Sequence, residues 1–400
     1  MKRMIYLFCI VSLCISCEQK QDVRKIEAVY TVNLDDIKPE GDPLMASAIF
    51  KNVKTIILED HDYAVIGMIN ELQVFEDKIF ILDYDFAKKL FVFDKNGKFV
   101  RQIGSKGQGP GEYRSIDDFC IDVEKRAIYI LDRDGSKVFV YNLDTGKYLN
   151  AVKLSPDESS CNYLAYYDNK LYTATVPYDY RKKSNLLMEL DIKTGEQKEY
   201  LDADTYNCGW NRLDFGPNNF FSAKLSDSPK FLAQYMNTVM NIDKDGVYPY
   251  LTVNHKNWVQ SSDMLSREEL EEQETDQQGI LISKKRTWLM QHNYLETDKY
   301  ICFKYIDEYR PYLAMFDKHT RETGIYNYLH NDLRGQVGFD SSLKFYNSHA
   351  AYEYIDPQLM PIFVAAIKNN ADKLPLNLDK RDELLKLNEE SIVIFEYEFK

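Results

Sequence analysis

A block of strand and turn signals that recurs about 49 residues later constrains the fold of this chain most strongly. In the first copy, residues 79–83 (IFILD) and 89–94 (KLFVFD) are short apolar runs that each end in an aspartate. Asn96-Gly97 supplies a tight turn of the kind that permits positive φ, and residues 99–103 form the next strand signal. The order predicts consecutive antiparallel strands joined by short turns.

The same order returns immediately along the chain. Residues 128–132 (IYILD) match 79–83, residues 138–141 form the next strand signal, and Thr145-Gly146 is the turn before 147–152. A repeat of this length with about four strands is typical of a β-propeller blade. We therefore predict an all-β chain, with blade one at about 64–103 and blade two at about 114–152.

The segment between these blades carries a family resemblance. Residues 103–113 (IGSKGQGPGEY), followed by a strand at 116–123, resemble the blade junction of NHL-type propellers. They are more closely similar to bacterial six-bladed β-propeller lipoproteins of the NHL-like or TolB-like kind, over roughly residues 65–155. The resemblance implies a six-bladed β-propeller in the cell envelope, and it implies no catalytic residues.

The glycine-rich segment itself has two interpretations. A phosphate cradle of the Rossmann type needs a helix to follow, but a strand follows here, and no Lys-Ser/Thr pair completes a Walker loop. We therefore interpret the segment as a structural blade junction in which glycine permits close backbone approach. Its residues are Gly104, Gly107, Gly109, Pro110, Gly111, Glu112 and Tyr113.

The N-terminus has the pattern of a lipoprotein signal peptide. Met1-Lys2-Arg3 precedes an apolar run at 4–15 that is too short to span a bilayer as a helix, and Ser16-Cys17 follows. We expect residues 1–16 to be removed and Cys17 to be lipidated, although Cys14 stands where leucine is usual. An ordinary secretory signal cut nearby is the alternative. Residues 17–27 would then be a polar tether before a single propeller domain at 28–400.

Net charge and cysteine placement exclude several function classes. The formal net charge of −13 argues against nucleic acid and against adhesion to anionic membranes, so membrane contact is expected only through the lipid anchor. The four cysteines after Cys17 are widely scattered and form no CxxC pair, so we favour free thiols over disulfides. They are Cys120, Cys161, Cys208 and Cys302.

No local motif for catalysis or metal binding is present. The six histidines are singly placed, and neither HExxH nor GxSxG occurs. We therefore expect no metal and no cofactor. A propeller could still assemble a site from several blades without leaving a local motif.

The chain is longer than six plain blades of about 40 to 50 residues require. Ser266-x-x-Glu269 is a capping box that opens an acidic helix, and we predict helical insertions at about 262–278 and 357–390. Two early strand candidates, 28–32 and 53–58, are expected to meet the C-terminal strand at 392–399 in the last blade, which would close the ring.

Propeller topology predicts one binding face. Loops between the second and third strands of a blade and loops between blades lie on the same face of a propeller. Aromatic and cationic residues in such loops could stack on sugars or peptides and pair with carboxylates. Packing within their own loops is the alternative. The candidate ligand-binding residues are Tyr178, Tyr180, Arg181, Trp210 and Arg212.

Three functions remain open at this point. We favour a non-enzymatic envelope propeller, at the outer membrane, that acts as a binding or scaffold module for a small molecule, glycan, peptide or partner protein. The alternative is a lyase or hydrolase whose catalytic residues converge from several blades at the channel mouth. The third is a purely structural member of an envelope assembly.

Overall fold

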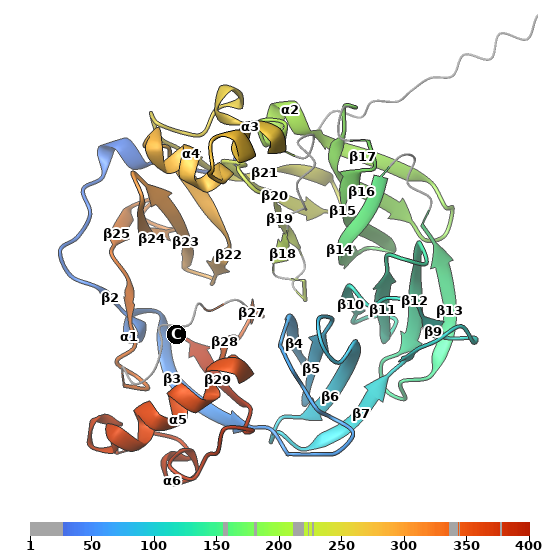
Figure 1. Cartoon of the computed structure of the whole chain (residues 1–400). Helices are drawn as coiled ribbons and strands as arrows, with labels where there is room; N and C mark the ends of the chain where they lie inside the picture. Colours follow the sequence, from blue (N-terminus) through green and yellow to red (C-terminus); the bar gives the residue numbers. More distant parts are fainter. Residues whose placement is uncertain are drawn as a thin grey trace, which may run out of the picture.

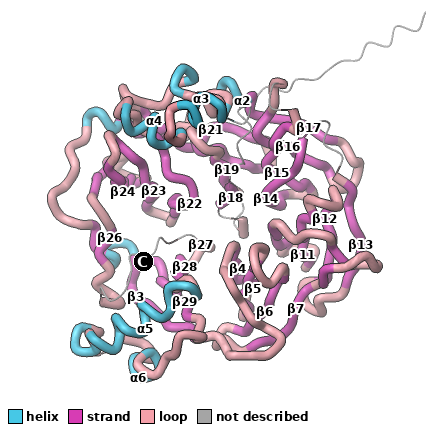
Figure 2. Tube along the Cα trace, viewed as in Figure 1, coloured by secondary structure: helices cyan, strands magenta, loops and turns pink. Residues whose placement is uncertain are grey.

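Six β-sheets form a ring around a central channel in this computed structural model (Figure 1). The structure describes residues 27–400, apart from 155–158, 180–181, 211–219, 223, 226–227, 336–342, 344 and 377. The first strand of each sheet lies nearest the centre of the ring, and helices are few and short (Figure 2). The predicted six-bladed β-propeller with short helical insertions is confirmed.

Blades one and two are four-stranded antiparallel sheets in sequential order, at the positions that the repeat predicts. Blade one contains β4 (Glu71–Phe75), β5 (Lys78–Asp83), β6 (Lys89–Asp94) and β7 (Phe99–Ile103). Blade two contains β10 (Asp118–Asp122), β11 (Ala127–Asp132), β12 (Lys137–Asn142) and β13 (Tyr148–Lys153).

Blades three to five follow the same sequential strand order. Blade three contains β14 (Ser159–Tyr167), β15 (Lys170–Pro177), β16 (Asn185–Asp191) and β17 (Gln197–Asp202). Blade four contains β18 (Phe220–Ser222), β19 (Lys230–Leu232), β20 (Thr238–Asp243) and β21 (Gly246–Asn254). Blade five contains β22 (Trp288–Glu296), β23 (Tyr300–Asp307), β24 (Arg310–Asp317) and β25 (Thr323–Tyr326).

The repeated aspartate at the end of the second strand explains why the sequence repeat is so regular. Asp83 accepts hydrogen bonds from the backbone N–H groups of Gly67 at 2.8 Å and Phe86 at 2.8 Å. Asp132 does the same in blade two, where Ser115 and Gly135 are donors at 3.0 and 2.9 Å. Each buried carboxylate therefore ties the loop that enters its blade to the turn after the second strand.

Blade six closes the ring by joining the two ends of the chain. It contains β27 (Phe345–Tyr346), β28 (Ala350–Tyr354), β29 (Val393–Phe399) and β3 (Phe50–Ile57), in that order. β29 and β3 pair antiparallel, with Phe395 opposite Thr55. The expected pairing of 53–58 with 392–399 is confirmed.

The earlier strand candidate at 28–32 does not join the last blade as expected. It forms β1 (Tyr30–Asn33), which pairs in parallel with β21 at the outer edge of blade four. Farther along the chain, β2 (Leu44–Met45) pairs in parallel with β26 (Leu329–His330), next to blade five. Residues 30–57 therefore run along the rim from blade four to blade six, and we call them the N-terminal strap (Figure 1).

Short helices occupy both of the stretches where insertions were predicted. The first has η3 (Ser261–Asp263), α3 (Arg267–Glu272) and α4 (Gln277–Ser283), and the predicted capping box between Ser266 and Glu269 is present. The second has η4 (Pro357–Leu359), α5 (Met360–Asn369), η5 (Ala371–Lys373) and α6 (Arg381–Leu384). The remaining short helices are η1 (Leu34–Asp36), α1 (Ala46–Ile49) and α2 (Ala203–Tyr206). Among the described residues, no helix is long and apolar enough to cross a bilayer.

The glycine-rich junction is a tight loop between blades one and two. Its ends pair in parallel as β8 (Ser105–Lys106) and β9 (Glu112–Tyr113). Gly104 and Gly111 have φ of +64° and +77°, and a Cβ on Gly104 would lie 2.6 Å from the Tyr141 hydroxyl. The Glu112 carboxylate accepts the Gly109 N–H at 2.8 Å. Gly107, Pro110 and Tyr113 lie in the same loop, with the Tyr113 ring fully buried.

The four cysteines after Cys17 are free thiols, as favoured from the sequence. Cys120, Cys161 and Cys302 are buried, and Cys208 is partly buried. Burial raises the pKa of each thiol above its usual range. A raised pKa keeps a thiol protonated at neutral pH, so these cysteines are poor nucleophiles.

We predict that Asp132→Ala destabilises the propeller by about 2 to 4 kcal/mol, because it leaves three partly buried backbone N–H groups, those of Arg114, Ser115 and Gly135, without an acceptor. Asp134→Ala is the matched control, since Asp134 is exposed two residues away. Urea unfolding of both variants measures the difference. Equal midpoints would contradict the role given to the repeated aspartate.

Candidate functional site

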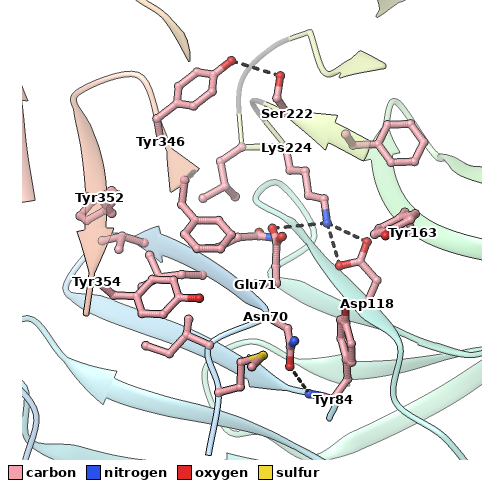
Figure 3. A pocket seen from close by; sticks show the side chains of 18 of the residues that line it. Asn70, Glu71, Tyr84, Asp118, Tyr163, Ser222, Lys224, Tyr346, Tyr352 and Tyr354 are labelled. Carbon is pink, nitrogen blue, oxygen red and sulfur yellow. Dashed lines mark hydrogen bonds and ion pairs between the residues drawn. The ribbon is translucent and has the colours of Figure 1, made fainter. Parts of the chain in front are cut away.

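A cavity of about 210 Å³ opens in the central channel. Its lining comes from blades one, two, three, four and six, so it exists only in the assembled ring. Glu71 lies in the middle of the view in Figure 3, with Lys224 and Asp118 beside it and tyrosines on both sides. The polar and aromatic lining includes Asn70, Glu71, Gln73, Tyr84, Asp117, Asp118, Tyr163, Ser222, Lys224, Tyr346, Tyr352 and Tyr354.

A buried lysine joins two carboxylates in the wall of this cavity. The Lys224 Nζ lies 2.8 and 2.7 Å from the two carboxylate oxygens of Asp118, and 3.4 Å from Glu71 Oε1. Asp118 is 2% exposed and Lys224 is 7% exposed. The three residues come from β10, from the segment after β18 and from β4. We call this group the channel ion cluster.

Backbone groups fix the position of Asp118. It accepts the N–H of Leu164 at 2.5 Å and that of its neighbour Phe119 at 2.8 Å. Gln73 donates from Nε2 to Glu71 Oε1 at 3.3 Å and to the Phe119 carbonyl oxygen at 3.0 Å. The cluster is therefore held by strands of blades one, two and three rather than by mobile side chains alone.

Burial shifts the pKa of each ionisable group in the cluster. Burial, together with the Asp118 charge, raises the pKa of Glu71 from its usual 4.5 to about 7, against the opposing effect of Lys224. Burial also raises the pKa of Asp118, although Lys224 works against it. For Lys224, burial lowers the pKa, but the two carboxylates outweigh burial and the net shift is upward. Lys224 therefore stays protonated at neutral pH.

Five tyrosines surround the ion cluster: Tyr84, Tyr163, Tyr346, Tyr352 and Tyr354. Tyr163 has φ of +57° and sits where β14 bulges out of register between Asn162 and Leu164. Such bulges re-aim side chains, and here the bulge directs Tyr163 to the channel. Burial raises the pKa of all five phenols, so their hydroxyl groups are neutral and can donate hydrogen bonds.

A larger hollow of about 1160 Å³ lies at the other end of the channel. It is lined by turns after the first strands, among them Glu76, Asp122 and Asp168. Lys224 and Leu225 line both spaces. Val74 and Tyr352 also line both spaces, so the cavity and the hollow adjoin each other.

Of the sequence-predicted ligand-binding residues, the structure describes Tyr178 and Trp210, and neither lines this cavity. Tyr178 follows β15 and is 68% exposed, whereas Trp210 is only 7% exposed. The Trp210 ring packs edge-on against Tyr235 at 5.0 Å, within a core cluster beneath the first helical insertion. Tyr180, Arg181 and Arg212 lie outside the described residues.

The residues that do line the cavity left weak signals in the sequence. Glu71, Gln73 and Asp118 are polar residues on the innermost strands of their blades, where a purely structural strand would be apolar. Lys224 lies in the least regular part of the repeat. Among the described residues, no group of three or more histidine, cysteine, aspartate or glutamate side chains is arranged to hold a metal ion.

Comparison with protein families gives one match that covers nearly the whole chain. Residues 29–394 match the family described as "Domain of unknown function (DUF4934)". The chain belongs to this family. No curated protein matches it.

Two solved structures are similar to this chain. One, described as "a Putative exported protein" from Bacteroides fragilis, has 17% identity and a TM-score of 0.65 over 93% of this chain and 99% of that one. Another, a DUF4221 member from Bacteroides vulgatus, has 12% identity and a TM-score of 0.49, over 88% of this chain and 97% of that one. At these identities, the first likeness shows only that this DUF4934 chain shares the propeller fold.

We predict that Glu71→Gln stabilises the protein relative to the parent increasingly as pH rises from 5 to 8. The pKa of Glu71 is higher in the folded chain than its usual value, so the parent loses stability as the pH rises through about 7. The difference should reach at most about 3 kcal/mol, because one pKa unit corresponds to about 1.4 kcal/mol. Urea unfolding midpoints at four pH values measure it.

Glu124→Gln is the control for this experiment, because Glu124 is exposed. It should leave the pH profile of stability unchanged. A Glu71→Gln profile parallel to that of the parent protein would show that Glu71 ionises normally in the folded chain.

Proposed function

We propose that the protein is a ligand-binding module whose site is the channel cavity. The observation that carries this proposal is a tyrosine-lined cavity built around a buried ion cluster. Ligand sites typically combine aromatic walls with a few placed polar groups. Tyrosine supplies large contact area at little rotamer cost, together with a hydroxyl that can bond to a polar ligand.

The size of the cavity indicates how much of a ligand it can enclose. Sites for drug-sized molecules usually measure about 300 to 1,000 Å³, whereas this cavity measures about 210 Å³. It therefore suits a small molecule, one sugar unit of a glycan or one side chain of a peptide. A larger ligand would continue into the wider hollow at the other end of the channel.

Catalysis at the same cavity is the second candidate function. Burial brings the pKa of Glu71 to about 7, which is the range that suits a general acid or base at neutral pH. Glu71 would then act as the proton-transfer group of a lyase or hydrolase. Product analysis on any ligand that binds separates the two candidates, because Glu71→Gln should abolish turnover but leave the propeller folded.

We propose that the protein is anchored in the cell envelope through a lipid on Cys17. The basic start, the short apolar run and Ser16-Cys17 support this proposal. The exported Bacteroides fragilis protein of the same fold is in keeping with it. The outer membrane is the proposed site, and the acidic net charge of −13 favours contact with the membrane through the anchor alone.

We predict that a ligand of the cavity raises the Tm of the soluble protein, expressed as residues 22–400 without the lipid anchor, and that Tyr354→Ala weakens its binding at least tenfold. A ligand at 100 times its Kd stabilises the folded state by about 2.7 kcal/mol. Thermal unfolding against monosaccharides, amino sugars and short peptides identifies candidates, and calorimetry then gives the Kd for each variant.

Tyr178→Ala is the matched control, because Tyr178 is an exposed loop tyrosine away from the cavity. It should leave the Kd unchanged. If Tyr178→Ala abolished binding and Tyr354→Ala did not, the ligand would bind on the loop face and the channel proposal would fail.

We predict that Cys17→Ala releases the full-length protein from membranes, while Cys14→Leu leaves it membrane-bound. Only Cys17 follows the small residue at which lipoprotein signals are cut. Detergent phase partitioning of each variant, expressed in a bacterial host, measures the effect. Retention of Cys17→Ala in the detergent phase would rule out this cysteine as the anchor.

A further inference from the structure

In the channel ion cluster, the hydrogen-bonding capacity of Asp118 is filled, whereas that of Glu71 is not. Asp118 has both oxygens occupied by Lys224, and it also accepts two backbone N–H groups. The Lys224 ammonium contacts both of those oxygens and, at 3.4 Å, the Phe119 carbonyl oxygen. Asp118 and Lys224 therefore form a closed pair with no net charge.

Glu71 is bonded on one side only. Its Oε1 lies 3.3 Å from Gln73 Nε2 and 3.4 Å from Lys224 Nζ. Oε2 receives no hydrogen bond from the described residues, and the side chain keeps 21% exposure. One carboxylate oxygen thus remains free to accept a hydrogen bond within the cavity.

A second acceptor in the same wall also lacks a donor. Gln73 is 5% exposed, and its amide nitrogen is committed to Glu71 and Phe119. Its Oε1 has no partner among the described residues. A buried acceptor without a donor is unfavourable, so a ligand that donates hydrogen bonds to this wall would be stabilised there.

The remaining carboxylate in the lining, Asp117, already has a cationic partner outside the cavity lining. Asp117 is paired with Arg133 at 3.3 Å and also accepts the Arg133 backbone N–H. Lys224 is the one cationic side chain among the described lining residues, and Asp118 neutralises it. When Glu71 is ionised, the cavity therefore carries one uncompensated negative charge.

The tyrosines around Glu71 suit a positive charge. Tyr84 and Tyr163 lie on one side of Glu71 in Figure 3, and Tyr346, Tyr352 and Tyr354 lie on the other. Aromatic faces attract ammonium groups, and the attraction is stronger at sites shielded from water. Carboxylate and rings together match a group that is both cationic and a hydrogen-bond donor.

We propose that the cavity selects its ligand through a primary ammonium group, which donates to Glu71 Oε2 between the tyrosine rings. This inference rests on the proposed binding function and names its ligand class. A lysine-type side chain and an amino sugar both carry such a group and are small enough in cross-section for one unit to enter. A calcium ion would need six to eight oxygen ligands, and the described lining offers far fewer unpaired ones.

The test measures the Kd of matched amine and neutral probes by calorimetry on the same soluble protein, residues 22–400. Nα-acetyl-lysine methylamide is compared with Nα-acetyl-norleucine methylamide, and glucosamine is compared with glucose. We expect at least one amine probe to bind ten or more times more tightly than its neutral match. The lysine and sugar arms distinguish the two sources of the amine.

The same calorimetry at pH 6, 7 and 8 tests the partner of the amine. The lysine probe keeps its charge over this range, because its amine has a pKa of about 10.4. Glu71 ionises as pH rises through about 7, so affinity for this probe should increase about tenfold between pH 6 and pH 8. Glu71→Gln should bind at least tenfold more weakly, with no pH dependence, whereas Glu124→Gln should match the parent.

The outcomes separate this inference from the proposed function. Equal binding of amine and neutral probes, lost in Tyr354→Ala, would overturn the amine selectivity and leave the binding module standing. Calcium binding that depends on Glu71 would also overturn it. If no probe binds, the amine inference fails, whereas the proposed binding function is decided by the thermal unfolding screen. The pH profile of the parent protein does not depend on any variant folding correctly.

Discussion

Closure of the ring is the constraint on which the rest of this structure depends. β29 and β3 join residues more than 300 positions apart, and their pairing completes blade six. The channel cavity lies at the seam between blade six and blade one, because Glu71 and Gln73 belong to blade one whereas Tyr352 and Tyr354 belong to blade six. Asn347 reaches across the seam to the Val74 carbonyl oxygen at 3.2 Å. Without closure, the two walls of the cavity would not face each other.

The channel ion cluster places three charged side chains where their burial costs stability. Removing charges from water is costly, and a buried pair recovers that cost only with good geometry and additional hydrogen bonds. Asp118 and Lys224 meet both conditions, whereas Glu71 meets neither fully. An apolar residue at position 71 would be the simpler choice for a structural strand. The incomplete pairing of Glu71 is the feature that the proposed ammonium ligand would complete.

The blades could be predicted from the sequence because their signals are local. The IFILD and IYILD runs end in aspartates that make equivalent contacts, and the Ser266 capping box forms as expected. The pairing of β1 with blade four could not be predicted, since parallel addition to an outer edge needs no distinctive residues. The cavity was missed for a different reason. Its residues come from separate blades, and Trp210 packs in the core although aromatic loop residues suggested a binding face.

The N-terminal strap also determines how the molecule would respond to tension. A pull on residue 27 loads β1 first, then β2, and reaches the ring-closing strand β3 only after both have detached. The β1–β21 and β2–β26 pairings would therefore break, one after the other, before the ring opens. If the proposed lipid anchor holds the chain at Cys17, tension would break these two pairings before it reached the strand that closes the ring.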